Sequence, residues 1–140
     1  MKQKATLVNS NQGIFYFYIM GIEKVKLNKG EYVFCSVNNL KNIEISNVIG
    51  SFREIEGYSI IISKDEAIKK KLTFYFISAW ITLKLNSSLD SVGLTSTFSK
   101  ALSDEKISCN IVAGYHHDHI FVPYKEKDKA MKVLNEIFES

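Results

Sequence analysis

The order of apolar and polar positions predicts a chain that alternates between strands and helices. Stretches in which β-branched and aromatic residues alternate with polar ones, or follow one another, are typical of strands. They occur at residues 14–20, 22–28, 31–37, 48–56, 58–63, 77–85, 107–113 and 117–122, and residues 73–76 lead into the sixth of them. Apolar residues return at helical spacing in residues 63–72, 94–104 and 125–138.

The connections between these stretches contain typical turn and cap residues. The turn at residues 28–30 predicts a hairpin between the second and third strands, and Gly57 predicts another between the fourth and fifth. Ser63 and Glu66 form a capping box at the start of a helix. Residues 38–47 are expected to be irregular or briefly helical.

The element order of the C-terminal part is that of a ferredoxin-like half. Residues 77–138 read as strand, helix, strand, strand, helix, and the N-terminal part repeats this order without a long linker. We therefore expect an α+β protein of two ferredoxin-like (βαββαβ) halves, residues 1–72 and 73–140, each an antiparallel sheet with helices on one face. The second half ends in its helix, so a strand from residues 14–20 or 22–28 is expected to complete its sheet and cover the unpaired edge.

Composition and charge narrow the classes of partner. With 46% hydrophobic and 24% charged residues, the chain is typical of globular proteins. Each half is so small that it would be only marginally stable without the other. A net charge of +3 is too small for a nucleic-acid surface, and residues 69–71, all lysine, are interpreted as a solvated helix end. Residues 14–20 are too short to cross a membrane. Cys35 and Cys109, in separate strands, predict reduced thiols and a cytoplasmic protein.

The segment His116-His117-Asp118-His119 is the first candidate for chemistry. In a strand, His117 and His119 point to one face and the other two residues to the opposite face, so one metal ion would need a bend or a further ligand. A polar hairpin corner is the preferred interpretation over a metal site. No nucleophile elbow, P-loop or dinucleotide-binding motif is present, so we predict no catalytic residue, no cofactor and no metal.

The turn at residues 86–94 is the second candidate. It lies between the end of a strand and the start of a helix, where unpaired backbone N–H groups and the positive end of the helix dipole favour a carboxylate. Ser88 adds a hydroxyl group, and Gly93 leaves the approach free of a side chain. A helix start capped by Asp90 or Ser91 explains the same residues, and the residues alone leave both interpretations open.

Two segments of the C-terminal half, SSLDSVGLT and ISCNIVAGYHHDHIFVPY, resemble the ACT domain, as found in small proteins with two ACT domains and no catalytic domain. In the N-terminal half, KGEYVFCSV and SFREIEGYSIII resemble the same group, so the resemblance extends over roughly residues 22–137. It implies amino-acid binding at the turn before the helix, usually against a second ACT unit. Carried over to this chain, the ligand contacts are Ser88, Leu89, Val92, Gly93 and Leu94, faced by Asn110, Ile111 and Val112.

These observations predict a non-catalytic sensor or regulatory module that binds a small molecule, and the resemblance favours an amino acid. The expected partners are this ligand, a second copy of the chain in a homodimer, and a protein of unknown identity that the module regulates. Neither nucleic acid nor a membrane is expected. Two alternatives stay open: a structural dimerisation module without a ligand, and an RNA-binding module, since RRM domains share this element order. The second is weaker because no segment matches the aromatic RRM motif.

Overall fold

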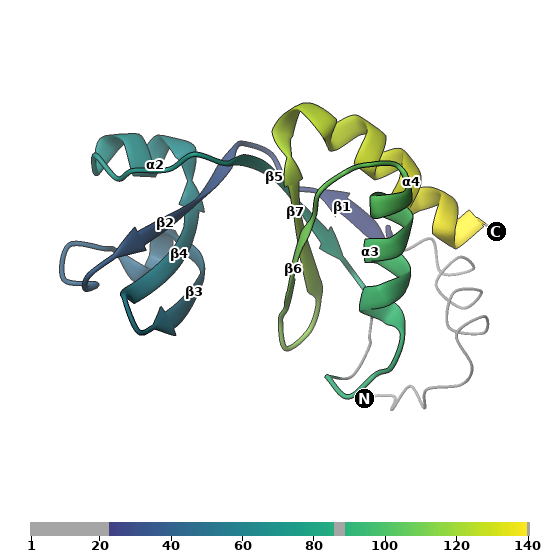
Figure 1. Cartoon of the computed structure of the whole chain (residues 1–140), viewed down its shortest axis with the longest axis horizontal. Coiled ribbons are helices and arrows are strands. Elements are labelled where there is room, and N and C mark those ends of the chain that lie inside the picture. Colours follow the sequence, from purple (N-terminus) through teal and green to yellow (C-terminus); the bar gives the residue numbers. More distant parts are fainter. Residues whose placement is uncertain (1–22, 86–88, 140) are drawn as a thin grey trace.

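The computed structural model describes residues 23–85 and 89–139, and Figure 1 shows how its elements are arranged. The strands are β1 (Val25–Leu27), β2 (Tyr32–Val37), β3 (Val48–Glu54), β4 (Gly57–Ser63), β5 (Ile77–Leu83), β6 (Asn110–Ala113) and β7 (Asp118–Pro123). The helices are α2 (Lys64–Lys69), α3 (Leu94–Asp104) and α4 (Lys127–Glu139), with short 3-10 helices η1 (Ile45–Asn47) and η2 (Tyr124–Glu126). The three predicted helices are confirmed, and Ser63 caps α2 by accepting the Glu66 backbone N–H at 3.2 Å.

A single antiparallel sheet runs through both halves, and β5 is the strand that they share. The strand order is β3-β4-β2-β5-β7-β6, and β1 also pairs with β5. Ile77 and Ser78 pair with β2, whereas residues 81–83 pair with β1. The other edge of β5 pairs with β7. The first residues of β5 thus complete the N-terminal sheet, and its remaining residues belong to the C-terminal sheet. This arrangement confirms an α+β fold of two ferredoxin-like halves (Figure 1).

β1 supplies the strand that the C-terminal half lacks. Val25 pairs with Leu83, and its side chain, only 2% exposed, packs in the C-terminal core. The prediction that a segment of residues 22–28 completes this sheet is confirmed, while the alternative, residues 14–20, lies outside the described residues. The first described strand therefore belongs to the second half of the molecule.

Some predictions about local pairing are wrong. β1 and β2 do not form a hairpin with each other, because β1 pairs with β5, and β2 pairs with β4 and β5. The two strands follow one another along β5, since the apolar side chains of β1 belong to the C-terminal core and those of β2 to the N-terminal core. Residues 73–76 and 107–109 are not strands, because pairing with neighbouring strands begins only at Ile77 and Asn110.

The described helices lie on one face of the sheet, as predicted. Ala79, Ile81 and Leu83 of β5 pack into the core that α3 and α4 cover, and Ile77, which shares their face, packs against the smaller core under α2. The buried residues of the C-terminal core are Val25, Ala79, Ile81, Leu83, Leu85, Phe98, Leu102, Ile107, Ile120, Val122, Ala130, Leu134 and Phe138. Those of the N-terminal core are Val33, Cys35, Ile60, Ile62 and Ala67. The N-terminal core is smaller because residues 38–47, in the place of a first helix, contain only η1.

Four aromatic side chains on the opposite face of the sheet join the two halves, and we call them the aromatic junction. They are Tyr32 and Phe34 of β2, Trp80 of β5 and Phe121 of β7. Tyr32 meets Trp80 edge to face with ring centroids 5.2 Å apart, and Phe34 meets Phe121 in the same way at 5.3 Å. Trp80 stacks on Phe121 at 6.4 Å, and Phe121 is only 1% exposed.

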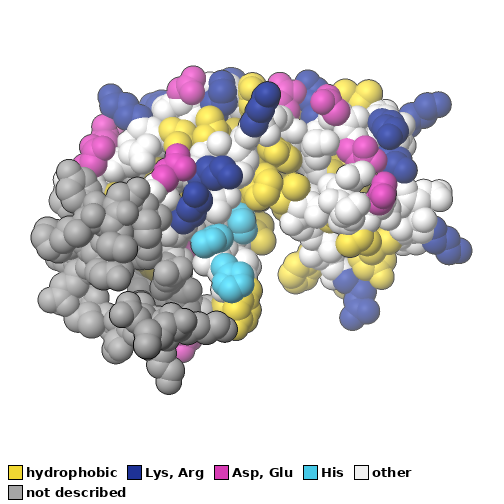
Figure 2. Space-filling model, turned by 180° about the vertical axis from the view of Figure 1, so that it is seen from behind, with side chains coloured by type: hydrophobic (Ala, Val, Ile, Leu, Met, Phe, Trp, Pro, Cys, Tyr) yellow, Lys and Arg dark blue, Asp and Glu magenta, His cyan; other side chains and the backbone are white. Residues whose placement is uncertain are grey.

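β2 and β7 are not neighbours in the sheet, so the contact between Phe34 and Phe121 requires the sheet to bend toward this face. Figure 2 shows the result from behind: a hollow separates the two halves, with hydrophobic side chains at its closed end and histidine side chains along one wall. The two halves therefore meet at β5 and at the aromatic junction.

The position of Val25 predicts a stability effect in the C-terminal half. Val25→Ala removes two buried methyl groups and should lower the free energy of unfolding by roughly 1–3 kcal/mol. Val92→Ala, whose side chain is 98% exposed, is the matched control and should change it by less than about 0.5 kcal/mol. Urea unfolding followed by circular dichroism measures both, and equal effects of the two variants would show that β1 does not close the sheet.

Candidate functional site

A cavity lies between the start of α3 and the turn that joins β6 to β7, and we call it the mouth. Its lining residues are Leu89, Ser91, Leu94, Thr95, Ala113, Gly114, His117 and Asp118. It contains about 380 Å³ of empty space, part of it open to solvent.

α3 begins at the mouth, and its N-cap residue has no side chain. The N-cap is Gly93, whose φ of 95° is a left-handed conformation that favours glycine. The Gly93 carbonyl accepts the Thr97 backbone N–H at 3.1 Å and the hydroxyl groups of Thr97 and Ser96 at 2.8 and 2.9 Å. The first turn of α3 contains no acidic residue. Because Leu94 and Thr95 line the mouth, the positive end of the helix dipole lies at the cavity.

The residues predicted before α3 fall in different places. Leu89 and Leu94 line the mouth, whereas Val92 is almost fully exposed and is not one of its described lining residues. An added Cβ at Gly93 would meet no described atom within 4 Å, so its positive φ explains this glycine within the described structure. Ser88 lies outside the described residues.

The three residues predicted in β6 are not among the described lining residues of the mouth. Ile111 packs against the C-terminal core, and Asn110 and Val112, which alternate with it along the strand, are exposed on the opposite face. The chain reaches the cavity just beyond them, at Ala113 and Gly114.

The second wall of the mouth comes from the turn GYHHDH, whose residue types predict a polar hairpin corner. This turn and the strand after it contribute Gly114, His117 and Asp118 to the lining. The available signal was a polar cluster at the hairpin that follows the helix. Spacing along the chain does not show that this hairpin returns to the start of α3, so the sequence does not predict Gly114, His117 and Asp118 as lining residues.

Groups of opposite charge border the mouth. Asp118 supplies a carboxylate from β7, and the start of α3 supplies the positive end of a dipole. The described lining contains no lysine or arginine. His117 adds a ring whose Nδ1 is buried and has no hydrogen-bond partner in the described part of the chain. Leaving a buried polar atom unpaired costs about 1–3 kcal/mol.

His119 lies behind the mouth, next to the aromatic junction. Trp80 donates its Nε1–H to Nδ1 of His119 at 3.0 Å. An indole can only donate, so the neutral imidazole carries its proton on Nε2. Burial lowers the pKa of His119 below the ordinary 6.5, and the charge of His117 lowers it further, while Asp118 acts in the opposite direction. A second proton on the ring would occupy Nδ1 and break the bond to Trp80.

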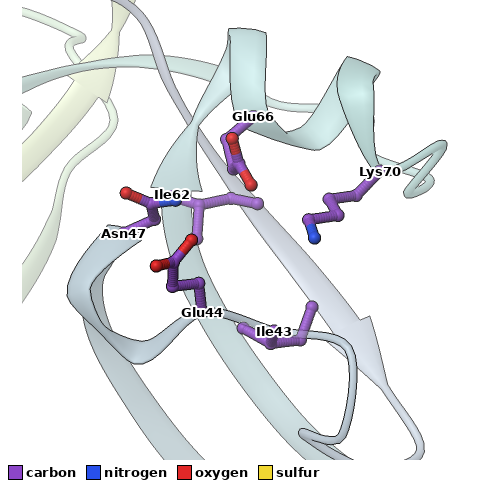
Figure 3. Close-up of a pocket in the computed structure, with 6 residues that line it drawn as sticks. All are labelled: Ile43, Glu44, Asn47, Ile62, Glu66 and Lys70. Carbon is purple, nitrogen blue, oxygen red and sulfur yellow. The ribbon is translucent and has the colours of Figure 1, made fainter.

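A second, smaller cavity lies in the N-terminal half between η1 and α2 (Figure 3). It contains about 190 Å³ and is lined by Ile43, Glu44, Asn47, Ile62, Glu66 and Lys70. Figure 3 shows the ammonium group of Lys70 directed into the space that Glu44 and Glu66 also border. Within residues 23–85 and 89–139, no three His, Cys, Asp or Glu side chains are grouped so that they could hold a metal ion.

The two cysteines are free and packed away from the mouth. Cys35 is buried in the N-terminal core, and Cys109 packs against the C-terminal core. Burial raises the pKa of both thiols, so both stay protonated at neutral pH and are poor nucleophiles. The described lining of the mouth therefore offers binding groups and no activated thiol.

Comparison with protein families agrees with this architecture. One model of the ACT domain, ACT_7, matches residues 76–136, and a second ACT-domain model, ACT_3, matches residues 24–79. The two matches overlap at residues 76–79, where β5 begins. The chain belongs to the ACT-domain family and contains two ACT domains in tandem.

Solved structures with this fold include proteins from several bacteria. A Vibrio cholerae protein of unknown function, described as a possible transport protein, is 38% identical, with a TM-score of 0.74 over 79% of this chain and 86% of that chain. An Agrobacterium tumefaciens protein is 19% identical, with a TM-score of 0.59 over 80% and 86% of the two chains. The ligand-free regulatory subunit of aspartate kinase from Thermus thermophilus is 9% identical, with a TM-score of 0.58 over 80% and 94%. The last two show the fold alone. A search of curated proteins gave no match.

ACT domains are regulatory, so the two family matches support a regulatory ligand-binding module. Among the described helices, none combines the length and the apolar character needed to span a bilayer.

The bond between His119 and Trp80 predicts a loss of stability in acid. Because the pKa of His119 is lower in the folded protein than its ordinary 6.5, the unfolded chain binds this proton more readily. The contribution of neutral His119 is therefore fully present above pH 6.5 and is lost as the pH falls toward the lowered value. Urea unfolding from neutral to acidic pH measures the slope, and the fluorescence of Trp80, the single tryptophan, should follow the same transition.

His119→Gln keeps an acceptor for Trp80 but cannot be protonated in this range, so it should flatten the acid slope. His116→Gln, at an exposed position, is the matched control and should leave the slope as it is. A slope that persists in His119→Gln would contradict this explanation.

Proposed function

We propose that the protein is a non-catalytic regulatory module that binds an amino acid at the mouth. The observation that carries the proposal is that the positive start of α3 and the carboxylate of Asp118 border one cavity. Backbone N–H groups at a helix start suit an α-carboxylate, and Asp118 suits an α-ammonium group. Leu89, Leu94 and Ala113 offer an apolar surface to the side chain of the ligand.

The other contacts implied by the family resemblance remain part of this proposal. They are Ser88, Val92, Gly93, Asn110, Ile111 and Val112. The last three belong to β6, which lies at the edge of the sheet. A second copy of the chain paired along β6 would cover the exposed Asn110 and Val112, and we propose such a homodimer as the setting in which they take part.

We propose that the chain consists of two halves, residues 1–72 and residues 73–140. We also propose that each chain has one ligand site. In the N-terminal half, residues 38–47 occupy the place of the first helix, and only Ile45–Asn47 are helical. A single 3-10 turn lacks the aligned peptide dipoles that make a helix start attractive to a carboxylate. The described residues of this half therefore contain no counterpart of α3 and the mouth.

The aromatic junction argues against the RNA-binding alternative. RRM domains stack bases on accessible aromatic side chains of their sheet. Here Phe121 is buried between Phe34 and Trp80, so its ring is not available to a base. The other alternative, a dimerisation module without a ligand, differs in one outcome: its stability would respond to no small molecule.

We further propose that the module acts on a separate protein in the cytoplasm. The free thiols of Cys35 and Cys109 are consistent with a reducing compartment. The described lining of the mouth offers groups that bind a ligand. Binding has a regulatory effect only if a partner protein responds to the ligand-bound module.

A thermal-shift screen of the proteinogenic amino acids tests the proposal. An amino acid that binds the mouth and is present at about 100 times its Kd should stabilise the fold by roughly 2.7 kcal/mol, which raises the Tm by several degrees. Isothermal titration calorimetry with the amino acid that gives the largest shift should then report one site per chain.

The variant Asp118→Asn tests the site itself. It keeps the shape of the side chain but removes its charge, so binding should weaken about 10- to 100-fold, as expected for the loss of roughly 1.5–3 kcal/mol from a hydrogen bond to a charged group. Glu56→Gln, in the exposed turn between β3 and β4, is the control and should bind normally. Unchanged binding by Asp118→Asn would place the ligand elsewhere, and a screen without any shift would favour the dimerisation module.

A further inference from the structure

A continuous series of contacts connects the mouth with the aromatic junction. Gly114 lines the mouth, and its backbone lies so close to His119 that an added Cβ would be 3.1 Å from Nε2 of the ring. The Nδ1 of the same ring accepts the Trp80 Nε1–H at 3.0 Å. Trp80 meets Tyr32 of β2 edge to face. The series therefore leads from the cavity in the C-terminal half to the first strand of the N-terminal sheet.

We propose that His119 is a positioning residue that couples the shape of the mouth to the packing between the two halves. This inference rests on the proposed function, because it gives a bound ligand a route to the N-terminal half. A ligand held between α3 and the β6–β7 turn restricts the backbone at Gly114, and that backbone limits where the His119 ring can lie. The ring position decides whether Trp80 keeps its hydrogen bond and its contact with Tyr32.

Short contacts hold both ends of this series in place. The turn is closed by the Gly114 N–H, which donates to the His117 carbonyl at 2.9 Å, and an added Cβ at Gly114 would be 2.8 Å from that oxygen. On the far side, the Trp80 carbonyl accepts the Asn28 side-chain amide at 3.2 Å. Closely packed groups transmit a displacement to their neighbours.

The backbone pairing at the junction is short. β2 and β5 pair only through Tyr32 with Ser78 and Val33 with Ile77. Ser78 adds a hydrogen bond from its hydroxyl to the Tyr32 carbonyl at 2.8 Å. With so few backbone pairs, the aromatic contacts provide much of the packing between the halves. A change at Trp80 therefore alters how the N-terminal half is held.

Gly114→Ala tests the coupling from the mouth to the junction. The added methyl group must displace the His117 carbonyl or the His119 ring, so the emission maximum of Trp80 and its quenching by acrylamide should both change. Gly50→Ala in β3 is the matched control, because its Cβ would make an ordinary contact of 3.5 Å with Ile61, and it should leave Trp80 unaffected.

The same substitution in a His119→Ala background tests the route. Without the ring, Gly114→Ala should no longer change the emission of Trp80 beyond the change caused by His119→Ala alone. The proposal is overturned if Gly114→Ala leaves Trp80 unchanged, as the Gly50→Ala control should, or if its effect has the same size when the His119 ring is absent.

Phe34→Leu tests the opposite direction and does not depend on the folding of Gly114→Ala. Coupling is reciprocal, so loosening the junction should speed hydrogen exchange of the Gly114 amide at least about fivefold relative to the Lys106 amide, which lies just beyond α3 and donates to the Ser103 carbonyl. Phe52→Leu, at an exposed position of the same half, is the control. Equal relative exchange in the two variants would overturn the proposal. Neither experiment uses a ligand, so a screen that finds no amino acid would test the proposed function and not this coupling.

Discussion

The molecule depends on one strand that serves two sheets. β5 pairs with β2 through its first residues and with β1 through its last, while β7 occupies its other edge. Each half thus completes its sheet with a strand from the other part of the sequence, and neither can satisfy its backbone hydrogen bonds alone. Halves of this size also bury too little surface to be stable separately. The exchange of strands explains why the described residues form one body with two ACT domains.

The two faces of β5 have different roles. Ala79, Ile81 and Leu83 form the centre of the C-terminal core under α3 and α4, so they fix the scaffold on which the mouth is built. Trp80, on the opposite face, belongs to the aromatic junction and holds His119. Because alternate residues of one strand face opposite sides, the sequence of β5 connects the packing that forms the site with the packing that joins the halves.

The two ACT domains are unequal in the described residues. The C-terminal domain has both of its helices and the mouth, whereas the N-terminal domain has α2 and, in the place of its first helix, only η1. In the two proposals above, the C-terminal domain binds the ligand and His119 couples its site to the N-terminal domain. The short pairing of β2 with β5 and the aromatic junction connect the two halves.

By itself, the sequence determined the helices, the two-half architecture and the neighbourhood of the candidate site, because periodicity, caps and the turn before α3 are local features. Only the tertiary structure decided that residues 25–27 pair with β5 and not with β2, since a short apolar stretch fits several strand partners. It also decided that His117 and Asp118, and not Asn110 or Val112, face the start of α3, and that His119 meets Trp80. These contacts join residues far apart in the chain, and the bend of the sheet and the register of its strands select them.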